Sequence, residues 1–261
     1  MIRSSVLSFV LSFAILLAGS SAIAEVAEET VENTYSVPQK ANITVKNADG
    51  RIQVYGWEEN EIKVTAFKRA FTKERLDAIE INVEIADDSV LIDTIYPPAP
   101  EGSITADRSG TVEYVLLVPQ YATLTKLDLT NGEMVIEGMR GASINAQVGN
   151  GKLIVRNCFA PTEVSLTKGI MDVHFGWWED TGSSFRAELA DGNMRVGLPG
   201  TAAVLIDAVS ATGRVTNEFA KKEGESGGED GPTSNVQVGY DSGSVLELRT
   251  NSGNIKIDKI Y

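Results

Sequence analysis

The chain has a single cysteine, Cys158, and a single histidine, His174, among its 261 residues. One cysteine excludes an internal disulfide, so we expect packing alone to stabilise the fold. One histidine leaves the commonest general base and metal ligand of proteins almost absent. Beyond the N-terminus, no segment approaches 18 consecutive apolar residues, the length typical of a membrane-spanning helix. These scarcities argue against a disulfide scaffold, most metal sites and a helical membrane protein.

Positive charge is also scarce, since 23 lysines and arginines stand against 36 acidic residues, for a net charge of −13. Nucleic acids and anionic lipids are bound through basic patches, so neither is an expected partner. We expect an envelope protein or a glycan instead. No phosphate-binding, zinc-protease or serine-hydrolase motif occurs, and we expect no cofactor and no metal.

The first 24 residues have the pattern of a secretory signal peptide. Arg3 is followed by an apolar run at 6–18 and by the small-residue site AIA at 22–24, after which the chain turns acidic at Glu25. A positive start, a short apolar stretch and an A-x-A site are typical of such peptides. We therefore expect export to the periplasm or the cell surface, with no transmembrane span after cleavage. Residues 25–34, EVAEETVENT, predict a flexible acidic lead-in.

Glycine recurs within a repeated string along most of the chain. LDLTNGEMVIEG at 127–138 is one of seven such strings, each made of a short alternating segment, a turn and a second alternating segment. The turn glycines are Gly50, Gly132, Gly151, Gly169, Gly192, Gly213 and Gly253. Most are 18 to 23 residues apart, a period typical of stacked repeats. The longer interval before Gly253 leaves room for a degenerate copy near NVQVGYDSG at 235–243.

Side chains alternate with period two on both sides of each glycine. Apolar pairs follow it at the second and fourth positions, as Ile52/Val54, Met134/Ile136, Leu153/Val155, Met171/Val173, Met194/Val196 and Ile255/Ile257. The positions between them are mainly polar, which predicts strands with one face in a core and one in water. The sixth copy departs from the pattern, with Asn217 at an inward position.

Two architectures satisfy this pattern: coils of a parallel β-solenoid, or consecutive antiparallel hairpins. An Asn-Gly or Asp-Gly pair tolerates positive φ and allows a sharp corner. Arms of four to six residues and a period near 20 favour coils, which we expect to be three-sided. The solenoid is predicted over 123–261, after a less regular β-rich region or cap at 35–122. The charged, glycine-rich segment 220–235 predicts a mobile loop.

Within the N-terminal region, the pattern predicts strands at 35–46, 51–56, 61–67, 79–86, 89–96 and 111–118. TKERLDA at 72–78 predicts a short helix between two of these strands. Such a region could close the first coil, whose open edge would otherwise recruit other chains.

The chain from about residue 37 to residue 260 resembles the bacterial β-strand-repeat family labelled putative adhesins. The strings that carry the resemblance are ITVKNADGRIQVYGWEENEIKVTA from Ile43, VEYVLLVPQYATLTKLDLTNGEMVIEGMRG from Val112 and LELRTNSGNIKIDK from Leu246. The step from a strand ending at Pro119 into the first of the closely spaced repeats is the most specific element. The resemblance implies a single-stranded right-handed parallel β-helix with a surface or envelope role, and it implies no catalytic residues.

DVHFGWWEDTG at 172–182 is the best local constellation for a ligand. The candidate ligand-binding residues are Asp172, His174, Trp177, Trp178, Glu179 and Asp180. Exposed aromatic rings beside carboxylates and a histidine are typical of a sugar-binding surface, where rings stack and polar groups bind hydroxyls. The alternative is that the tryptophans pack against a cap or a neighbouring coil while the acids are solvated.

Two chemical possibilities are weaker. Asp172, Arg186 and Glu188 could be compared with the acidic calcium ligands and arginine of pectate-lyase-like β-helix enzymes. Acidic and amide residues recur before the turn glycines, as Asp49, Asn131, Asn150 and Asp191, and stacked turns could present a column of oxygens to calcium. Turn chemistry explains these residues without an ion, and we expect the protein not to be an enzyme.

The sequence therefore favours an exported, non-enzymatic, adhesin-like scaffold or binding protein of the bacterial cell envelope. A carbohydrate-binding or carbohydrate-cleaving β-helix protein centred on Trp177 and Asp172 is the first alternative. An envelope stress or signalling accessory protein is the second.

Overall fold

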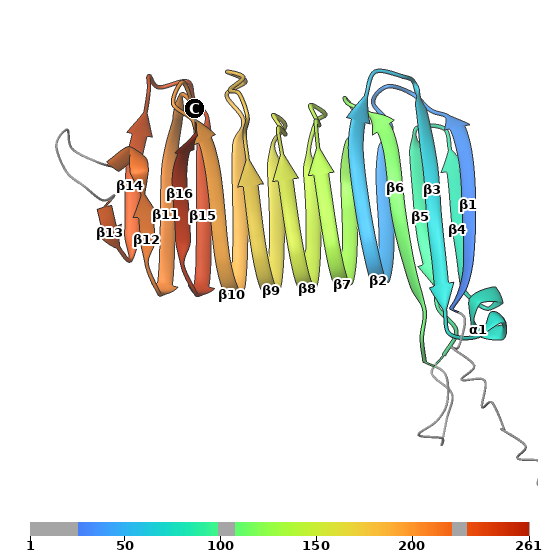
Figure 1. Ribbon diagram of the computed structural model, residues 1–261. Coiled ribbons are helices and arrows are strands. Elements are labelled where there is room, and N and C mark those ends of the chain that lie inside the picture. Colours follow the sequence, from blue (N-terminus) through green and yellow to red (C-terminus); the bar gives the residue numbers. More distant parts are fainter. Residues whose placement is uncertain (1–25, 99–107, 221–228, 261) are drawn as a thin grey trace, which may run out of the picture.

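The computed structural model describes residues 26–98, 108–220 and 229–260, and these are almost entirely β-strand (Figure 1). The strands of the described residues form one sheet, whose main path runs β1-β3-β6-β2-β7-β8-β9-β10-β15-β11-β14. The expected signal peptide at 1–24 lies outside the described residues. The chain is all-β, as the sequence predicts, and the pairings in the middle of the sheet are parallel.

Four long strands form the middle of the sheet. They are β7 (Thr123–Glu137), β8 (Ile144–Arg156), β9 (Thr162–His174) and β10 (Ser184–Pro199). They pair in one register, which places Gly132, Gly151, Gly169 and Gly192 side by side. β2 (Asn42–Trp57) joins them and aligns Gly50 with Gly132. The parallel register excludes the alternative of consecutive hairpins for these strands.

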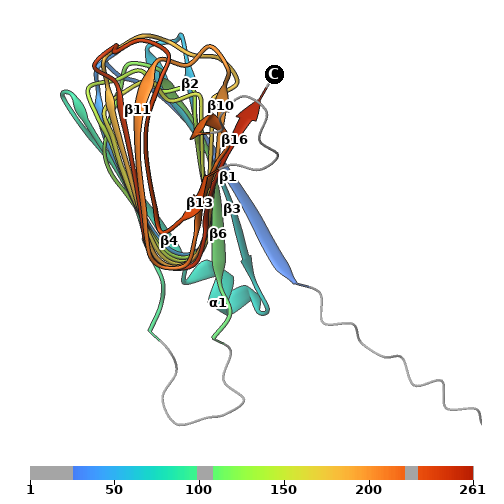
Figure 2. The ribbon, with the colours of Figure 1, turned by 90° about the vertical axis from the view of Figure 1, so that its left-hand side faces the viewer.

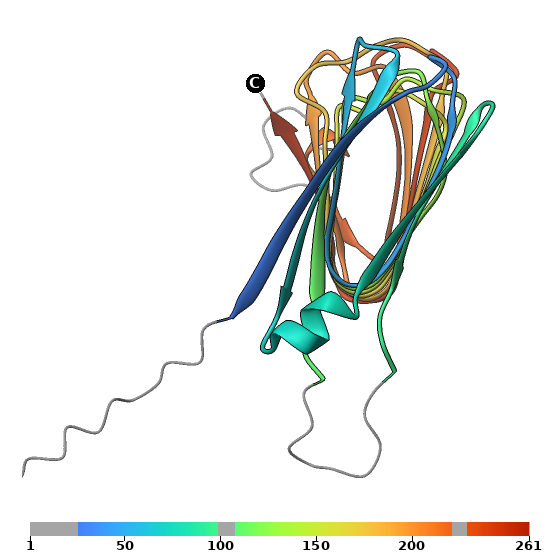
Figure 3. The ribbon, with the colours of Figure 1, turned by 90° about the vertical axis from the view of Figure 1, so that its right-hand side faces the viewer.

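The sheet is folded along this line of glycines, so that the two arms of each strand face each other across a narrow interior (Figures 2 and 3). Loops such as 138–143 and 157–161 carry the chain from the second arm of one coil to the first arm of the next. The expectation of three-sided coils is wrong, because each coil has two arms, one glycine corner and one closing loop. The corner lies within a continuous strand, so no third strand is needed.

The side chains expected to face inward are buried. Met134, Leu153 and Met171 lie side by side on neighbouring strands and are fully excluded from solvent. The corresponding pairs of the other copies, Ile52/Val54, Met194/Val196 and Ile255/Ile257, are buried as well. Burying one such side chain contributes about 1.5–3 kcal/mol, so the stacked pairs dominate the stability of the coil. The predicted burial of the inward positions is confirmed, whereas Val135 and Ile154, at positions expected to face outward, are buried as well.

The glycine column is required by contact as well as by conformation. Gly151 has a φ of 132°, and a Cβ added to it would lie 1.9 Å from the carbonyl oxygen of Gly132. A Cβ at Gly132, whose φ is 135°, would lie 1.8 Å from the carbonyl oxygen of Gly50. Both distances are far shorter than van der Waals contact. Each corner residue must therefore lack a side chain, because its Cβ would collide with the backbone of the neighbouring coil.

The acidic segment near the N-terminus is a strand, which corrects the expectation of a flexible lead-in at 25–34. β1 (Ala27–Ser36) pairs antiparallel with β3 (Glu61–Ala70). Its glutamates form ion pairs with basic side chains of β3, namely Glu28–Arg69, Glu29–Lys68 and Glu32–Lys63. Composition alone suggested disorder because the partner charges lie about 35 residues further along the chain.

The rest of the N-terminal region completes a coil outside β2. The first arm of β2 pairs with β5 (Ser89–Ile95) and its second arm pairs with β6 (Thr111–Pro119). β4 (Glu80–Ala86) forms a hairpin with β5. Helix α1 (Lys73–Asp77) connects β3 to β4 and is capped by the Thr72 side chain, which confirms the predicted short helix.

The C-terminal coil does not follow the order of the sequence. β15 (Val245–Ser252) and β16 (Ile255–Ile260) pair with β10 on one side. On the other side they pair with β11 (Val204–Thr212) and β12 (Val215–Asn217). The last coil therefore lies between two coils that precede it in the chain.

An antiparallel edge replaces the expected degenerate copy near 235–243. β14 (Thr233–Val238) pairs antiparallel with β11, and β13 (Glu229–Gly231) pairs antiparallel with β12. Of the loop predicted at 220–235, residues 221–228 lie outside the described residues, and most of the remainder belongs to these two strands. The short 3-10 helix η1 (Glu218–Ala220) precedes them.

Candidate functional site

The loops that close the coils lie along one edge of the molecule, opposite the glycine corners (Figure 1). We call this edge the loop rim and define it by residues 119–122, 138–143, 157–161, 175–183 and 239–244. The predicted ligand-binding motif at 172–182 leads from β9 into the rim. Because stacked strands are about 4.8 Å apart, successive loops of the rim are close neighbours although they are distant in sequence.

An aromatic cluster closes the interior beneath the rim. Its rings are those of Phe159, Phe175, Trp177, Trp178 and Phe185, with centroid separations of 5.5 to 6.3 Å. Phe159, Phe175 and Phe185 are buried, whereas Trp177 is 48% exposed. Tilted and edge-on pairs at such distances add to the energy of burial. The packing alternative is therefore correct for Trp178, while Trp177 keeps a face in solvent.

An ion pair between Arg140 and Glu179 connects the loops 138–143 and 175–183 of the rim. Arg140 donates from Nε to Oε2 of Glu179 at 3.0 Å and from Nη2 to Oε1 at 2.5 Å. The guanidinium also lies over the Phe159 ring, 5.6 Å from its centroid. Trp177 donates from Nε1 to the same carboxylate at 2.9 Å. These bonds order the loop 175–183 and hold the exposed tryptophan in one orientation.

The electrostatics of this pair oppose a role in acid catalysis. Hydrogen bonding from Arg140 lowers the pKa of Glu179 below its ordinary value, and the bond from Trp177 acts in the same direction. A carboxyl group that donates a proton to a leaving group needs a raised pKa instead. Glu179 is thus suited to positioning, with both oxygens engaged, and not to proton transfer.

Glu179→Gln is expected to lower the melting temperature at about pH 7 and to have little effect at about pH 3. A folded-state pKa below the ordinary 4.5 contributes stability that is present above that value and is lost as the pH falls through the folded value. We expect about 1 kcal/mol, since the pair is partly exposed. Thermal unfolding at both pH values measures the effect, with the exposed Glu59→Gln as control. An equal loss at both pH values would contradict the ion-pair explanation.

Three aromatic side chains stand exposed along the rim. Tyr121, Trp177 and Tyr240 are 40%, 48% and 64% exposed. Tyr121 precedes β7, Trp177 precedes β10, and Tyr240 precedes β15, the neighbour of β10. Three strand spacings separate β7 from β10, or about 14 Å. Tyr240 donates its hydroxyl hydrogen to Oδ2 of Asp180 at 2.6 Å, so the third ring is also held in place.

The structure places the predicted ligand-binding residues in two separate regions. It brings Trp177, Trp178 and Glu179 together in the rim and turns Asp180 toward Tyr240. Asp172 and His174 lie on the outer face of β9, in register with Arg195 and Gly197 of β10. The motif is therefore not one cluster, because the first two residues belong to a strand and the others to a loop.

Sequence reasoning missed Tyr121, Arg140 and Tyr240. Each lies in a short loop between alternating segments and has no motif around it. If the repeats are aligned on their turn glycines, the loops between them also align, and the loop of Arg140 then lies two positions before the loop of Glu179 in the stack. The opposite charges and the recurring aromatic residues of these loops were the available signal.

Comparison with known proteins identifies the fold family. The model of the Toastrack DUF4097 family matches residues 20–258, which is nearly the whole chain. The chain belongs to the Toastrack DUF4097 family. The resemblance to adhesin-like strand repeats is thereby confirmed.

Solved structures extend the comparison of this Toastrack chain. A "putative cell adhesion protein" from Clostridium sporogenes ATCC 15579 is 16% identical, with a TM-score of 0.53 over 90% of this chain and 100% of its own. A "putative adhesin" from Bacteroides fragilis NCTC 9343 is 14% identical, with a TM-score of 0.36 over 88% of this chain and 97% of its own. No curated protein matches the chain. The first of these structures shares the fold, and its identity is too low to transfer a ligand.

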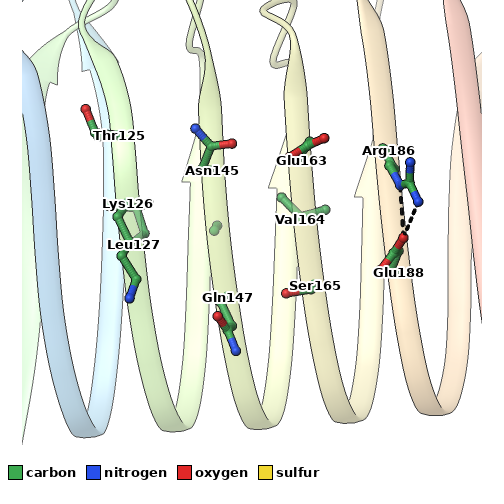
Figure 4. A pocket seen from close by; sticks show the side chains of 11 residues that line it. Thr125, Lys126, Leu127, Asn145, Gln147, Glu163, Val164, Ser165, Arg186 and Glu188 are labelled. Atoms are coloured by element: carbon green, nitrogen blue, oxygen red, sulfur yellow. Dashed lines mark hydrogen bonds and ion pairs between the residues drawn. The ribbon is translucent and has the colours of Figure 1, made fainter.

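A second surface of the Toastrack chain is a polar groove on the outer face of the first arms of β7–β10 (Figure 4). It encloses about 550 Å³ and is lined largely by polar side chains, including Asn145, Gln147 and Glu163. Arg186 and Glu188, both on β10, form an ion pair along one side of it at 2.7 Å. Asp172 lies on the second arm of β9, beyond the glycine corner. The three residues compared with a lyase site are thus on opposite arms of the folded sheet.

The residues that precede the turn glycines form a column and interact with one another. Asn131 donates to Oδ1 of Asp49 at 2.9 Å, and Asn150 donates to Oδ1 of Asn131 at 3.0 Å. Lys168 follows on the next coil, 3.6 Å from a carboxylate oxygen of Asp191. Amide and ammonium donors within the column make it a poor cage for calcium. Among the described residues, no group of three or more acidic, histidine or cysteine side chains could hold a metal ion.

Proposed function

We propose that this Toastrack chain is an adhesin-like, non-enzymatic binding scaffold of the bacterial cell envelope, and that the loop rim is its ligand-binding surface. The observation that carries the proposal is the row formed by Tyr121, Trp177 and Tyr240. Each ring is at least 40% exposed, and two of them are hydrogen-bonded to a carboxylate. Exposed apolar side chains gathered along one edge are typical of a surface that contacts a partner.

A glycan is the ligand class that fits this row best. Aromatic faces stack on sugar rings, and the neighbouring Arg140, Glu179 and Asp180 offer charged groups to hydroxyls. A row about 14 Å long between Tyr121 and Trp177 would span an oligosaccharide of several units. The lowered pKa of Glu179 supports recognition over cleavage. Asp172 and His174, on the outer face beside the rim, would extend the contact on one side.

Export fits the same proposal. The N-terminal pattern at 1–24 predicts a signal peptide, and the structural likeness to a protein named for cell adhesion agrees with a location outside the cytoplasm. No helix among the described residues is long and apolar enough to cross a membrane. We further propose that the coils wind as a right-handed β-helix, the hand that parallel connections favour. In this arrangement the repeats from β7 onward are the scaffold, and the strands before them are its N-terminal end.

Trp177→Ala is expected to weaken glycan binding at least tenfold, because loss of one stacking ring costs about 1.4 kcal/mol or more. The measurement is binding of purified protein to a glycan array and to fragments of bacterial envelope polysaccharide. Ile170→Ala is the matched control, since Ile170 is 55% exposed but lies on the outer face of β9. Tyr121→Ala tests the other end of the row and should act in the same direction.

Two results would reject the proposed function. Unchanged binding by Trp177→Ala and Tyr121→Ala would remove the rim from recognition. Cleavage of an oligosaccharide by the wild-type chain, lost on Glu179→Gln, would show an enzyme instead of a scaffold. Circular dichroism of each variant checks that the coils are intact.

A further inference from the structure

The two ends of the folded sheet are closed differently. At the C-terminal end, β13 and β14 cover the edge of the coil formed by β11 and β12, and the buried side chain of Asn217 donates to Oγ of Ser234 at 3.0 Å. At the N-terminal end, β1 and β3 form one wall and β4 and β5 form the other (Figure 3). In the described part of the chain, β1 pairs only with β3 and β4 pairs only with β5. The interior is therefore open between these two walls.

A cleft of about 390 Å³ lies at this open end. Val31 and Tyr35 of β1 line it on one side, and Ile81 and Val83 of β4 line it on the other. These four side chains are only partly buried, and the next apolar residue of β4, Ile85, is 40% exposed. The apolar row that packs tightly in every inner coil thus continues into solvent along β4.

β4 also has a free backbone edge. A strand paired on one side points alternate N–H and C=O groups away from its partner, and β4 presents these groups over seven residues. A further strand beside β4 would satisfy them and would place its own alternate side chains against Ile81, Val83 and Ile85. This is the mode by which extended segments add to exposed sheet edges.

The charges at this end of the sheet indicate which kind of strand could pair with β4. Glu80 and Glu84 alternate with the apolar residues of β4, and Asp87 and Asp88 follow in its turn. The glutamates of β1 are paired with Lys63, Lys68 and Arg69 across the other wall. Among the described residues, no lysine or arginine forms an ion pair with the carboxylates of β4 and its turn, so the carboxylates without a basic partner are on the β4 side. A second copy of this chain would bring the same acids and a net charge of −13, which opposes pairing of β4 with itself.

We propose that β4 is a strand-addition site whose partner is an extended segment of another protein, with apolar residues alternating with lysine or arginine. Its apolar side chains enter the cleft between β4 and β1, and its basic side chains face Glu80 and Glu84. The site is distinct from the loop rim and does not depend on glycan binding there. It would allow the scaffold to be attached at its N-terminal end while the rim remains accessible.

Hydrogen–deuterium exchange of the purified chain with synthetic peptides tests the proposal. The peptide Lys-Val-Lys-Val-Lys-Val-Lys is expected to slow exchange of the β4 amides at least tenfold at saturation. Glu-Val-Glu-Val-Glu-Val-Glu should not protect them. β14, an uncharged edge strand at the opposite end, is the internal control and should be unaffected. Absence of protection in β4, or equal protection by both peptides, would overturn the proposal.

Variants of β4 and β1 separate insertion into the cleft from attraction of charge. Val83→Lys places a cation in the cleft, whereas Thr30→Lys adds the same charge on β1, at an exposed position that does not line the cleft. We expect Val83→Lys to weaken peptide binding at least tenfold and Thr30→Lys by no more than about threefold. Equal losses would mean that the peptide binds by charge alone and would reject the strand-addition site. Protection of β4 that depends on protein concentration without peptide would assign the edge to a second copy instead.

Discussion

Met134→Asp is expected to abolish folding. Met134 is fully buried and lies in register between Ile52 of β2 and Leu153 of β8, which are fully buried as well. An aspartate there would have only apolar side chains beside it on the neighbouring coils. Burying an unpaired carboxylate costs several kcal/mol even after relaxation, and the packing of the methionine is lost in addition. The sum reaches the whole stability of a typical domain.

The measurement is the yield of soluble protein and its circular dichroism after purification. Met134→Leu is the matched control and should cost less than about 1.5 kcal/mol, because it keeps volume and polarity. A soluble Met134→Asp protein with a wild-type spectrum would mean that the inward faces do not form a continuous dry core. The whole description of the coils would then be wrong.

Gly151→Ala is expected to destabilise the chain by about 4 kcal/mol, near the upper end for a single methyl group. Its φ of 132° is unfavourable for any L-residue, and the added Cβ would lie 1.9 Å from the carbonyl oxygen of Gly132. Relief requires the two coils to separate, which breaks the parallel ladder beside the corner. Chemical denaturation, followed by tryptophan fluorescence, gives the free energy of unfolding.

Gly243→Ala separates the two causes. Gly243 has a φ of 74°, but nothing lies within 4 Å of a Cβ added there. The backbone term alone should cost about 1 kcal/mol at this position. If both variants lost the same stability, the glycine column would be explained by conformation and the contact between corners would be irrelevant.

The core of this protein could be predicted from the sequence because burial follows parity. Residues such as Met171 and Val173 are separated by Asp172, which lies on the outer face, and stacking copies forces both apolar residues into the interior. The glycine corners could be predicted for a similar reason, since few residues tolerate the backbone of a sharp bend. These features are local, and each copy repeats the information.

The number of sides in a coil and the order of coils could not be predicted. A period near 20 is compatible with three short strands or with two arms and a loop, and only the register through Gly132 and Gly151 distinguishes them. The position of β15 between β10 and β11 could not be predicted either, because the alternation of apolar and polar residues is the same for any order of the coils. Apolar parity specifies which side chains are inside and does not specify which coil is next.

The candidate site was predicted only in part, for a related reason. Trp177 and Glu179 attracted notice as a dense local motif, but Arg140 lies 39 residues from Glu179 and completes the ion pair across the stack. Loops carry no periodic pattern, so their contacts depend on coil register and not on spacing along the chain. The strand β1 was missed in the same way, since its glutamates pair with β3.

The position of the last coil has a consequence for biogenesis. β10 and β11 do not pair with each other in this structure, because β15 lies between them and pairs with both. A chain synthesised only as far as β11 therefore has two edges that lack the partner they have in the folded protein. A foreign strand that paired with these edges first would block the insertion of β15 and β16.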